Sequence, residues 1–447
     1  MRITADFSDI TGAVKPMHGV GQAPFYCEDF SLLHYLRDAG VPFARLHDVG
    51  NWLGGGLYVD IPNLFRDFDA DPNDPAAYDF AFTDRLLCQL VENGVEPFFR
   101  LGVSIENSHD LRAYRIFPPR DPEKWAAICE GIVRHYNEGW ADGYRMGIRY
   151  WEIWNEPDDC FRPAESPMWQ GTREEYYRLY EITSKRLRAA FGNSIRIGGY
   201  ASCGFYAGDN YPDPAQIGQT PNDRMHFFFY FLDGFLRHVR DTGSPFDFFS
   251  WHTYADVETA CRHANTCRAI LNAYGFADVP DILDEWNTCF DVRLRSSAMA
   301  ASRALAMMLA MQDRSPSLLC YYDARIGPSA YGGMFNPDTW EPYKTYEAFY
   351  AFGEAYRMGR QIAVRTEQKA DGVQVMGAVR GDGHAGLLLF ANPTACAVPV
   401  TVDCRGLRPQ SLVLTDDTHT RAALPFPADG ALVLPPYSCF CVRGEYE

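Results

Sequence analysis

The chain has 447 residues, of which 47% are apolar, and a formal net charge of −17. This length predicts one large domain accompanied by a smaller one, and the apolar content excludes a disordered chain. The acidic surface opposes binding to nucleic acid or to an anionic membrane, because both carry negative charge themselves.

The cysteines and the first residues predict where the protein resides. Thirteen cysteines, an odd number scattered along the chain, are typical of reduced thiols in a cytoplasm. Residues 1–7 lack the basic and then apolar pattern of a secretion signal. No apolar run reaches the ~18 residues that a membrane-spanning helix needs. We therefore expect a cytoplasmic protein with no membrane partner, and the sequence leaves its oligomeric state open.

Short apolar runs alternate with helical stretches along most of the chain. Residues 1–15 predict a strand and a turn that precede this alternation. Strands two to eight of this alternation are then predicted at residues 41–47, 96–101, 148–156, 194–199, 245–252, 280–286 and 317–323. Helices are predicted at residues 29–39, 83–93, 172–191, 225–239, 260–274, 297–313 and 345–358, with a further one that begins at residue 121.

This alternation predicts an α/β fold, a (β/α)₈ TIM barrel over residues 16–358. A doubly wound open sheet is disfavoured, because no Gly-x-Gly-x-x-Gly motif opens a helix after the first strand. After Gly359 the chain changes to short β-rich runs separated by Gly, Pro and Asp-Gly turns. Residues 359–447 therefore predict a smaller C-terminal antiparallel β-sandwich domain. Residues 1–12 could add a strand to it and so bring the two termini together.

The fourth strand ends in a pair of polar residues. Tyr150 to Ile153 suit a buried strand, and Pro157 cannot continue a central ladder, so Asn155 and Glu156 are left at the strand's carboxyl end. In barrels of this kind the carboxyl ends of the strands hold the chemistry. Glu156 alone could equally cap the helix that follows it.

A second acid appears at the end of the seventh strand, where Glu285 follows Ile282, Leu283 and Asp284. Both glutamates are therefore expected at one rim of the barrel, facing one cavity. Two carboxyl groups held in this way are the equipment for cleaving a glycosidic bond, one as a proton donor and one as an ionised nucleophile. Their surroundings must separate the two pKa values. Glu285 by itself could instead form a salt bridge at the rim.

Here the chain resembles the clan of retaining glycoside hydrolases in which Asn-Glu ends strand four and Glu ends strand seven. It most resembles glycoside hydrolase family 39, which holds β-xylosidases and α-L-iduronidases. The resemblance covers residues ~16 to 355, and the family also carries a small β-sandwich. The matching segments are Arg45-Leu46-His47-Asp48, Trp151-Glu152-Ile153-Trp154-Asn155-Glu156-Pro157, Trp251-His252-Thr253-Tyr254 and Asp284-Glu285-Trp286-Asn287.

The resemblance implies roles for the two acids and a neighbour. Glu156 would be the general acid and then the base, and Glu285 the nucleophile that forms a glycosyl-enzyme intermediate. Asn155 would bind the 2-hydroxyl of the sugar. No cofactor and no metal are implied, and the expected partner is a glycoside or oligosaccharide.

Four further residues gain roles from the same resemblance. Arg45 and Tyr254 would bond to Glu285 and keep it ionised, since a nearby arginine lowers a carboxyl pKa. His47 and His252 would line the subsite at the cleavage point. Each of the four could instead be structural, as a neutralising charge or a packed core side chain. Glu152 is expected to pair with Arg45 or Arg100 in the barrel interior.

Long loops after several strands predict a closed pocket, which favours an exo-acting enzyme, and a β-xyloside is the first candidate substrate. A uronate would need a cation, for which Arg325 is a candidate, although an ion pair with Asp323 would explain it equally. Tyr322 ends strand eight where the resemblance to xylosidases leads us to expect tryptophan. Phe117 is a candidate ring for stacking on sugar, as are Trp52, Tyr114 and Tyr331.

Three alternatives stay open on the sequence. The chain could be an α-L-iduronidase-like enzyme or an arabinosidase of the same clan. It could also be a carbohydrate-binding protein that has lost catalysis, although both acids are present. A metal site is disfavoured because no ligand pair has zinc-site spacing. We interpret Gly54-Gly55-Gly56 as a lid of the active site rather than a phosphate loop, since no Lys-Ser/Thr follows.

Overall fold

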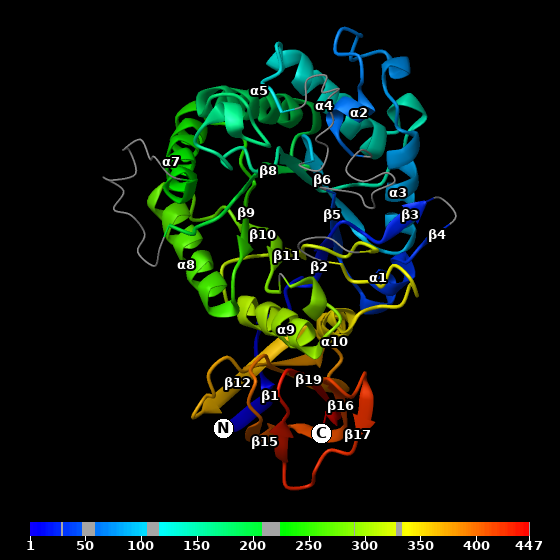
Figure 1. The fold of residues 1–447 in the computed structure, drawn as a ribbon, viewed down its shortest axis with the longest axis vertical. Helices are drawn as coiled ribbons and strands as arrows, with labels where there is room; N and C mark the ends of the chain where they lie inside the picture. Colours follow the sequence, from blue (N-terminus) through cyan, green and yellow to red (C-terminus); the bar gives the residue numbers. More distant parts are fainter. Residues whose placement is uncertain are drawn as a thin grey trace.

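Eight parallel strands close into a barrel in the computed structural model of this protein (Figure 1). The structure describes residues 1–27, 30–46, 59–104, 116–207, 224–289, 291–327 and 333–446. Strands that follow one another along the chain lie side by side, and the last pairs with the first. In chain order the barrel strands are β2 (Gly19–Gly21), β5 (Phe43–Leu46), β6 (Glu96–Leu101), β7 (Tyr150–Ile153), β8 (Arg196–Ser202), β9 (Phe248–Tyr254), β10 (Asp281–Asn287) and β11 (Leu319–Tyr321).

A ring of helices surrounds the barrel (Figure 1). Capping residues set where several of them begin: Asp121 accepts a hydrogen bond from the backbone of Lys124 at 3.1 Å, and Thr172 forms a capping box with Glu175. The described helices are α1 (Leu33–Ala39), α2 (Ile61–Leu64), α3 (Ala81–Glu92), α4 (Pro122–Asn137), α5 (Arg173–Phe191), α7 (Arg224–Thr242), α8 (Val257–Ala273), α9 (Ala298–Gln312) and α10 (Lys344–Met358).

Two helix starts differ from the sequence prediction by three residues or more. Helix α8 begins at Val257 rather than at residue 260, because Asp256 caps it by accepting a hydrogen bond from the backbone N–H of Thr259. Helix α1 begins at Leu33 rather than at residue 29. The chain before it forms β4 (Phe30–Ser31), which pairs with β3 (Phe25–Cys27).

Apolar side chains fill the amino-terminal end of the barrel interior. A buried cluster there takes one residue from most of the strands, namely Phe43, Phe98, Phe248, Ile282, Leu318 and Cys320, with Tyr150 packed against it. Side chains two residues further along a strand point to the same face. The residues that follow this layer toward the carboxyl ends therefore also face the interior, and they are mostly polar.

The C-terminal part of the chain forms one nine-stranded sheet of order β17-β16-β19-β14-β13-β12-β1-β15-β18, antiparallel except for the β1–β15 pair. The N-terminal strand therefore lies inside this sheet, and both termini are found there (Figure 1). Its strands are β1 (Arg2–Ala13), β12 (Gly359–Glu367), β13 (Gln374–Arg380), β14 (Ala385–Asn392), β15 (Val398–Arg405), β16 (Leu407–Thr415), β17 (Ala422–Leu424), β18 (Ala431–Leu434) and β19 (Ser438–Tyr446).

The two faces of this sheet have different partners. Leu388 and Phe390 belong to a core of the sheet's own, whereas Leu387 and Leu389, which alternate with them, belong to the barrel's core. Helices α9 and α10 supply the barrel side of this contact. The predicted fold class, a (β/α)₈ barrel with a smaller C-terminal antiparallel β domain, is confirmed. Within the described part of the chain, no helix combines the length and the apolar character needed to cross a membrane.

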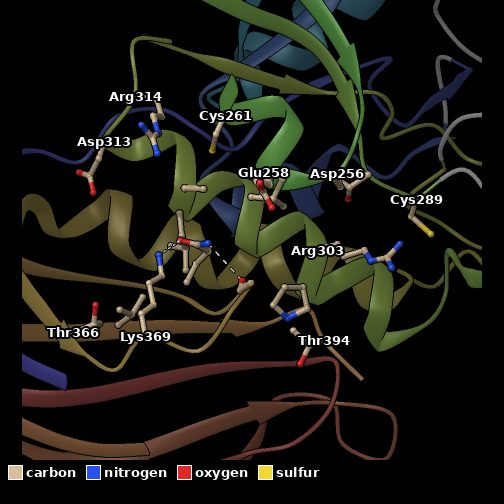
Figure 2. A pocket seen from close by; sticks show the side chains of 18 of the residues that line it. Asp256, Glu258, Cys261, Cys289, Arg303, Asp313, Arg314, Thr366, Lys369 and Thr394 are labelled. Atoms are coloured by element: carbon tan, nitrogen blue, oxygen red, sulfur yellow. Dashed lines mark hydrogen bonds between the residues drawn. The ribbon is translucent and has the colours of Figure 1, made fainter. Parts of the chain in front are cut away.

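A cavity of about 1000 Å³ lies between α8, α9 and the C-terminal sheet (Figure 2). Its lining combines charged residues such as Glu258, Arg303 and Lys369 with apolar ones such as Leu309 and Val364, and none of the described lining residues is aromatic. It contains neither Glu156 nor Glu285. The cavity is therefore separate from the site predicted at the barrel rim.

Candidate active site

The chain leaves β7 through two residues in the left-handed region. Trp154 has φ 77° and Glu156 has φ 45°, conformations that a bulky residue adopts only when its surroundings hold it there. The Trp154 backbone N–H donates to Leu101 at 2.8 Å and its indole N–H donates to Met168 at 3.0 Å. The backbone N–H of Glu156 donates to Ala201 at 3.0 Å. These contacts fix the turn that presents Asn155 and Glu156.

A register shift in β10 directs two consecutive acids into the barrel. Ile282 belongs to the interior layer, and Asp284, two residues further on, also faces inward. Pairing with β9 shifts between Leu283 and Glu285, which adds one residue to β10 at this point. Such bulges re-aim side chains near active sites. Glu285 consequently faces the interior together with Asp284.

One carboxylate oxygen of Glu156 and one of Glu285 lie within 4.8 Å of each other, and a ring nitrogen of His252 lies within the same distance of both. Retaining glycosidases hold their two carboxyl groups ~5 Å apart, and inverting enzymes hold them further apart to admit a water molecule. The close approach matches the retaining geometry. Both side chains are mostly buried, at 16% and 7% exposure.

Two donors bind the carboxylate of Glu285. The Tyr254 hydroxyl donates to Oε1, and Nη1 of Arg45 donates to Oε2 at 3.1 Å. Arg45 is 1% exposed, so its charge acts at low dielectric. These are the contacts expected for Arg45 and Tyr254 from the sequence. Because Arg45 lies on β5 and Tyr254 on β9, these two hydrogen bonds orient the carboxylate between the two strands.

Glu156 has a different set of neighbours. Nδ1 of His252 lies 2.7 Å from Oε1 of Glu156. On its other side, Asp159 and Cys203 each place an atom within 4.8 Å of a Glu156 oxygen. Arg224 forms an ion pair with Asp159. His252 thus contacts the predicted acid/base directly, a more specific position than lining the subsite.

The two glutamates compete for protons. Burial raises the pKa of Glu285 to about 7, with the charge of His252 opposing this and the charge of Glu156 adding to it. Burial also acts on Glu156, but the hydrogen bond and charge of His252 outweigh it and hold its pKa below the ordinary value. Because the groups are adjacent, their protons leave as those of one pair. The pair therefore keeps its last proton until the pH rises to about 7.

Asn155 is placed to bind a hydroxyl group. Its Oδ1 accepts a hydrogen bond from Nη2 of Arg45 at 2.7 Å. Its Nδ2 is buried and has no hydrogen-bond partner among the described residues. A buried amide donor without a partner is costly, and a ligand hydroxyl would satisfy it.

The end of strand eight carries Tyr322 and the ion pair of Arg325 with Asp323. The Tyr322 ring lies 6.3 Å from that of Tyr254, and its hydroxyl accepts a hydrogen bond from Nε2 of Gln22 at 2.7 Å. Arg325 Nε donates to Asp323 at 2.5 Å, and its Nη2 lies 3.4 Å from the Tyr322 hydroxyl. The charge of Arg325 is therefore compensated within the protein.

Several of the site residues predicted from the sequence are not brought to this site by the described structure. His47, Trp52 and residues 54–56, together with Tyr114 and Tyr331, lie outside the described residues. Phe117 is described and is 44% exposed. Its role as a stacking ring stays a prediction.

Sequence reasoning missed the inward-facing Asp284 and the neighbours of Glu156, Asp159 and Cys203. The alternation from Ile282 to Asp284 would have indicated the first. Nothing in the sequence indicated the other two, because they come from a turn after β7 and from the end of β8. Glu152 was expected to pair with Arg45 or Arg100, and it pairs with Arg45 at 2.7 Å.

Two groups of side chains have the geometry to hold a metal ion, Glu156 with His252 and Glu285, and Glu156 with Asp159 and Cys203. Arg45 already binds Glu285, and Arg224 already binds Asp159. A divalent cation would have to displace or repel these guanidinium groups. The absence of a metal and of a cofactor stays a prediction.

Comparison with known proteins yields two family matches. The model of glycosyl hydrolases family 39 matches residues 43–314. The model of the D-apionate lactonase C-terminal immunoglobulin-like domain matches residues 370–442. The first match contains β5 to β10, and with them both glutamates.

Individual relatives are distant. The β-xylosidase of Geobacillus stearothermophilus is 23% identical over 269 residues, which cover 53% of this chain and 46% of that protein. A glucosidase structure from Croceicoccus marinus has a TM-score of 0.79 at 20% identity and covers 100% of this chain and 99% of that one. A family 39 β-xylosidase structure from Caulobacter crescentus has a TM-score of 0.67 at 18% identity, with 100% of both chains covered. The solved structures support the fold, and the chain aligns with about half the length of the Geobacillus protein.

Proposed function

This chain belongs to glycosyl hydrolases family 39, and from that premise we propose that it is a retaining glycosidase acting by double displacement. Glu156 is the acid/base and Glu285 is the nucleophile. The observation that carries the proposal is the approach of their carboxylate oxygens to within 4.8 Å at the carboxyl ends of β7 and β10. That spacing suits direct attack on an anomeric carbon.

In the first step the Glu285 carboxylate attacks the anomeric carbon while Glu156 gives its proton to the leaving oxygen. The glycosidic bond breaks, the aglycone departs as an alcohol, and the sugar is left as an ester on Glu285. Nδ2 of Asn155, which has no partner among the described residues, donates to the 2-hydroxyl of the sugar. Arg45 and Tyr254 hold the attacking carboxylate in place.

In the second step Glu156, now ionised, removes a proton from a water molecule. The resulting hydroxide attacks the anomeric carbon from the side that the aglycone left, and the ester bond to Glu285 breaks. Glu156 is protonated again and Glu285 is ionised again. Two inversions give a product with the configuration of the substrate.

We infer exo action on a β-xyloside as the preferred substrate. Long connections follow the carboxyl ends of the strands: β5 ends at residue 46 and α3 begins at 81, and β8 ends at 202 and α7 begins at 224. Connections of this length favour a pocket over an open groove, and a pocket accepts a chain end. A uronate is less favoured because Asp323 and Tyr322 already engage Arg325.

A panel of aryl glycosides tests the proposal. We expect turnover of an aryl β-xyloside above that of the α-L-arabinofuranoside, β-glucoside and α-L-iduronide, with the β-anomer of the free sugar appearing first by NMR. An inverted first product would contradict the role of Glu285. Binding of sugars without turnover of any member would indicate a non-catalytic carbohydrate-binding protein.

A further inference from the structure

Four carboxyl groups and two nitrogen bases meet inside the barrel. Two of the acids are the paired glutamates, and the other two, Glu152 and Asp284, are fully buried below them. Arg45 lies 2.7 Å from Glu152 and 2.8 Å from Asp284. Four ionised carboxylates here would exceed the positive charge available, at a large cost in desolvation and repulsion.

The hydrogen bonds of Arg45 leave some of these oxygens without a donor. Nε and Nη2 of Arg45 both donate to Oε2 of Glu152, at 2.9 and 2.7 Å. Oε1 of Glu152 and both oxygens of Asp284 are buried and have no donor in hydrogen-bond geometry among the described residues. A proton on Oε1 of Glu152, directed at Asp284, would satisfy an oxygen of each.

The electrostatic surroundings favour this location of the proton. Burial raises the pKa of Glu152 to about 8, against the charge of Arg45, and the adjacent Asp284 raises it further. Burial acts on Asp284 in the same sense, but the charges of Arg45 and His252 outweigh it and bring its pKa to about 2. Glu152 is thus the acid that keeps its proton, and Asp284 the one that ionises.

His252 connects this buried pair to the acid/base. Its Nε2 lies 3.6 Å from Oδ1 of Asp284 and 3.7 Å from Oε2 of Glu285, and its Nδ1 lies 2.7 Å from Glu156. The ring is fully buried. Burial disfavours its charge, but Glu285 and Asp284 outweigh this and hold the pKa of His252 well above its usual value.

We propose that Asp284 is a positioning residue that acts through His252. Glu152 carries a proton and donates this O–H to Asp284, and the ionised Asp284 holds His252 as an imidazolium whose Nδ1–H is directed at Glu156. Asp284 thereby fixes the acid/base without touching the sugar. This inference rests on the proposed glycosidase function only for its catalytic consequence.

The groups that face Asp284 come from five strands of the barrel. They are Arg45 on β5, Glu152 on β7, His252 on β9, Glu285 on β10 itself and the buried thiol of Cys320 on β11. Among them, only Arg45 and His252 carry positive charge. Removing the negative charge of Asp284 should therefore weaken the stabilisation of the positive charges on Arg45 and His252.

A titration of His252 followed by NMR tests the contact without any substrate. The nitrogen signals of His252 are assigned by their loss in His252→Asn. In Asp284→Asn we expect the pKa of His252 to fall by at least one unit, since an adjacent negative charge is gone. A pKa within 0.3 of the wild-type value, in a variant with an unchanged fold, would overturn the proposal.

A pair of substitutions at Glu152 tests the location of the proton. Glutamine reproduces a protonated carboxyl, with one oxygen to accept from Arg45 and one N–H to donate to Asp284. Glu152→Gln should therefore keep the melting temperature of the wild type and the wild-type titration of His252, whereas Glu152→Ala should lose both. If Glu152→Gln is as damaged as Glu152→Ala, then Glu152 is ionised and the proposal fails.

Kinetic measurements on two substrates distinguish a positioning role of Asp284 from a general loss of structure in the variant. Asp284→Asn should lower kcat/KM tenfold or more for a phenyl glycoside, whose poor leaving group needs Glu156. It should lower the value for a 2,4-dinitrophenyl glycoside by a clearly smaller factor, which reports the effect through Arg45 on Glu285 alone. The effect should not add to that of His252→Asn in the double variant, because both act through one ring. Additive losses, or equal losses on both substrates, would contradict the proposal.

Asp281 provides the matched control. It is a buried acid on the same strand whose Oδ2 accepts hydrogen bonds from Trp251 and Ser315, away from the paired glutamates. Asp281→Asn should change stability but neither the His252 titration nor the ratio of the two substrates. Failure of the wild-type protein to hydrolyse any glycoside would contradict the proposed function, and the titration would still decide the Asp284–His252 contact.

Discussion

Nδ1 of His252 lies 2.7 Å from Oε1 of Glu156 in a partly buried contact. Because Nε2 of the same ring lies 3.7 Å from Glu285, the titration of each glutamate affects the other. The reactive form needs the single proton on Glu156 and the charge on Glu285. The pH dependence of the reaction therefore belongs to the pair.

We predict a bell-shaped pH dependence of kcat/KM. At low pH both glutamates are protonated, and the nucleophile is lost. As pH rises through about 7, the raised pKa of Glu285 marks the loss of the last proton of the pair, and the acid is lost. The basic limb should accordingly be centred near pH 7, measured with a phenyl glycoside at subsaturating concentration.

A substrate that needs no acid tests this assignment. For a 2,4-dinitrophenyl glycoside the departure of the leaving group requires no proton, so the basic limb should disappear when glycosylation is rate-limiting. The acid limb should persist, because Glu285 must still be ionised. A basic limb near pH 7 on both substrates would assign it to another group.

Removal of the acid/base is the second prediction. Glu156→Ala should lower kcat/KM for a phenyl glycoside by roughly 10²–10⁴-fold, the range expected for general acid catalysis. Azide should restore the turnover of activated substrates and give a glycosyl azide of retained configuration, because a small anion can enter the space and needs no base. Turnover and product are measured by spectrophotometry and NMR.

Two variants control the Glu156 experiment. Glu285→Gln should abolish turnover, and azide should not restore it with retained configuration, since no glycosyl ester forms. Glu165→Ala removes an exposed acid that pairs with Arg162 at the 3₁₀ helix Pro163–Glu165, and it should behave as the wild type. If azide restores the turnover of Glu285→Gln and the product keeps the configuration of the substrate, then Glu285 is the acid/base and Glu156 the nucleophile.

The hydroxyl of Tyr254 supports the third prediction. It donates to Oε1 of Glu285, and a hydrogen bond to a charged group contributes ~1.5–3 kcal/mol. Tyr254→Phe should therefore lower kcat/KM by roughly 10–100-fold, with the larger effect on kcat. Tyr180→Phe is the matched control, because this buried hydroxyl donates to Pro245 on the outer side of the barrel. A loss of activity as large in the control would indicate a general packing effect.

The alternation of strands and helices was enough to predict the barrel and the placing of both glutamates at one rim. Each of these follows from local patterns: apolar runs that stop at a polar residue or a proline, and helices that stop at glycine. The sequence predicted β-rich runs after Gly359 but gave no bounds for β12. Its exposed arginines and glutamate interrupt the apolar pattern, because one side of this strand faces solvent.

The network beneath the glutamates depends on tertiary register that no local pattern contains. Strict alternation places Ile282 and Asp284 inside and Glu285 outside, and only the register shift against β9 brings Glu285 inward as well. The contact of His252 with Glu156 likewise requires the left-handed turn after β7. The sequence identified these residue types, but their mutual distances come from the barrel.

The last prediction concerns stability and Asp158, a fully buried acid beside Glu156. It accepts hydrogen bonds from the Ser202 hydroxyl at 2.7 Å and from the backbone of Cys203 at 3.1 Å. Burial nevertheless raises its pKa from 3.8 to about 7. A carboxyl whose pKa is raised by folding stabilises the fold below its unfolded pKa and loses that contribution as pH rises to the folded value.

Asp158→Asn should therefore gain stability relative to the wild type as pH rises, because the amide has no charge to bury. Between pH 5 and pH 8 the difference in the free energy of unfolding should move by roughly 3 kcal/mol in favour of the variant, at about 1.4 kcal/mol per pKa unit. Urea unfolding at the two pH values measures it, with Asp38→Asn as a control whose exposed carboxylate pairs with Arg37. A difference that stays constant with pH would mean that Asp158 is ionised throughout, held by charges other than those of its present neighbours.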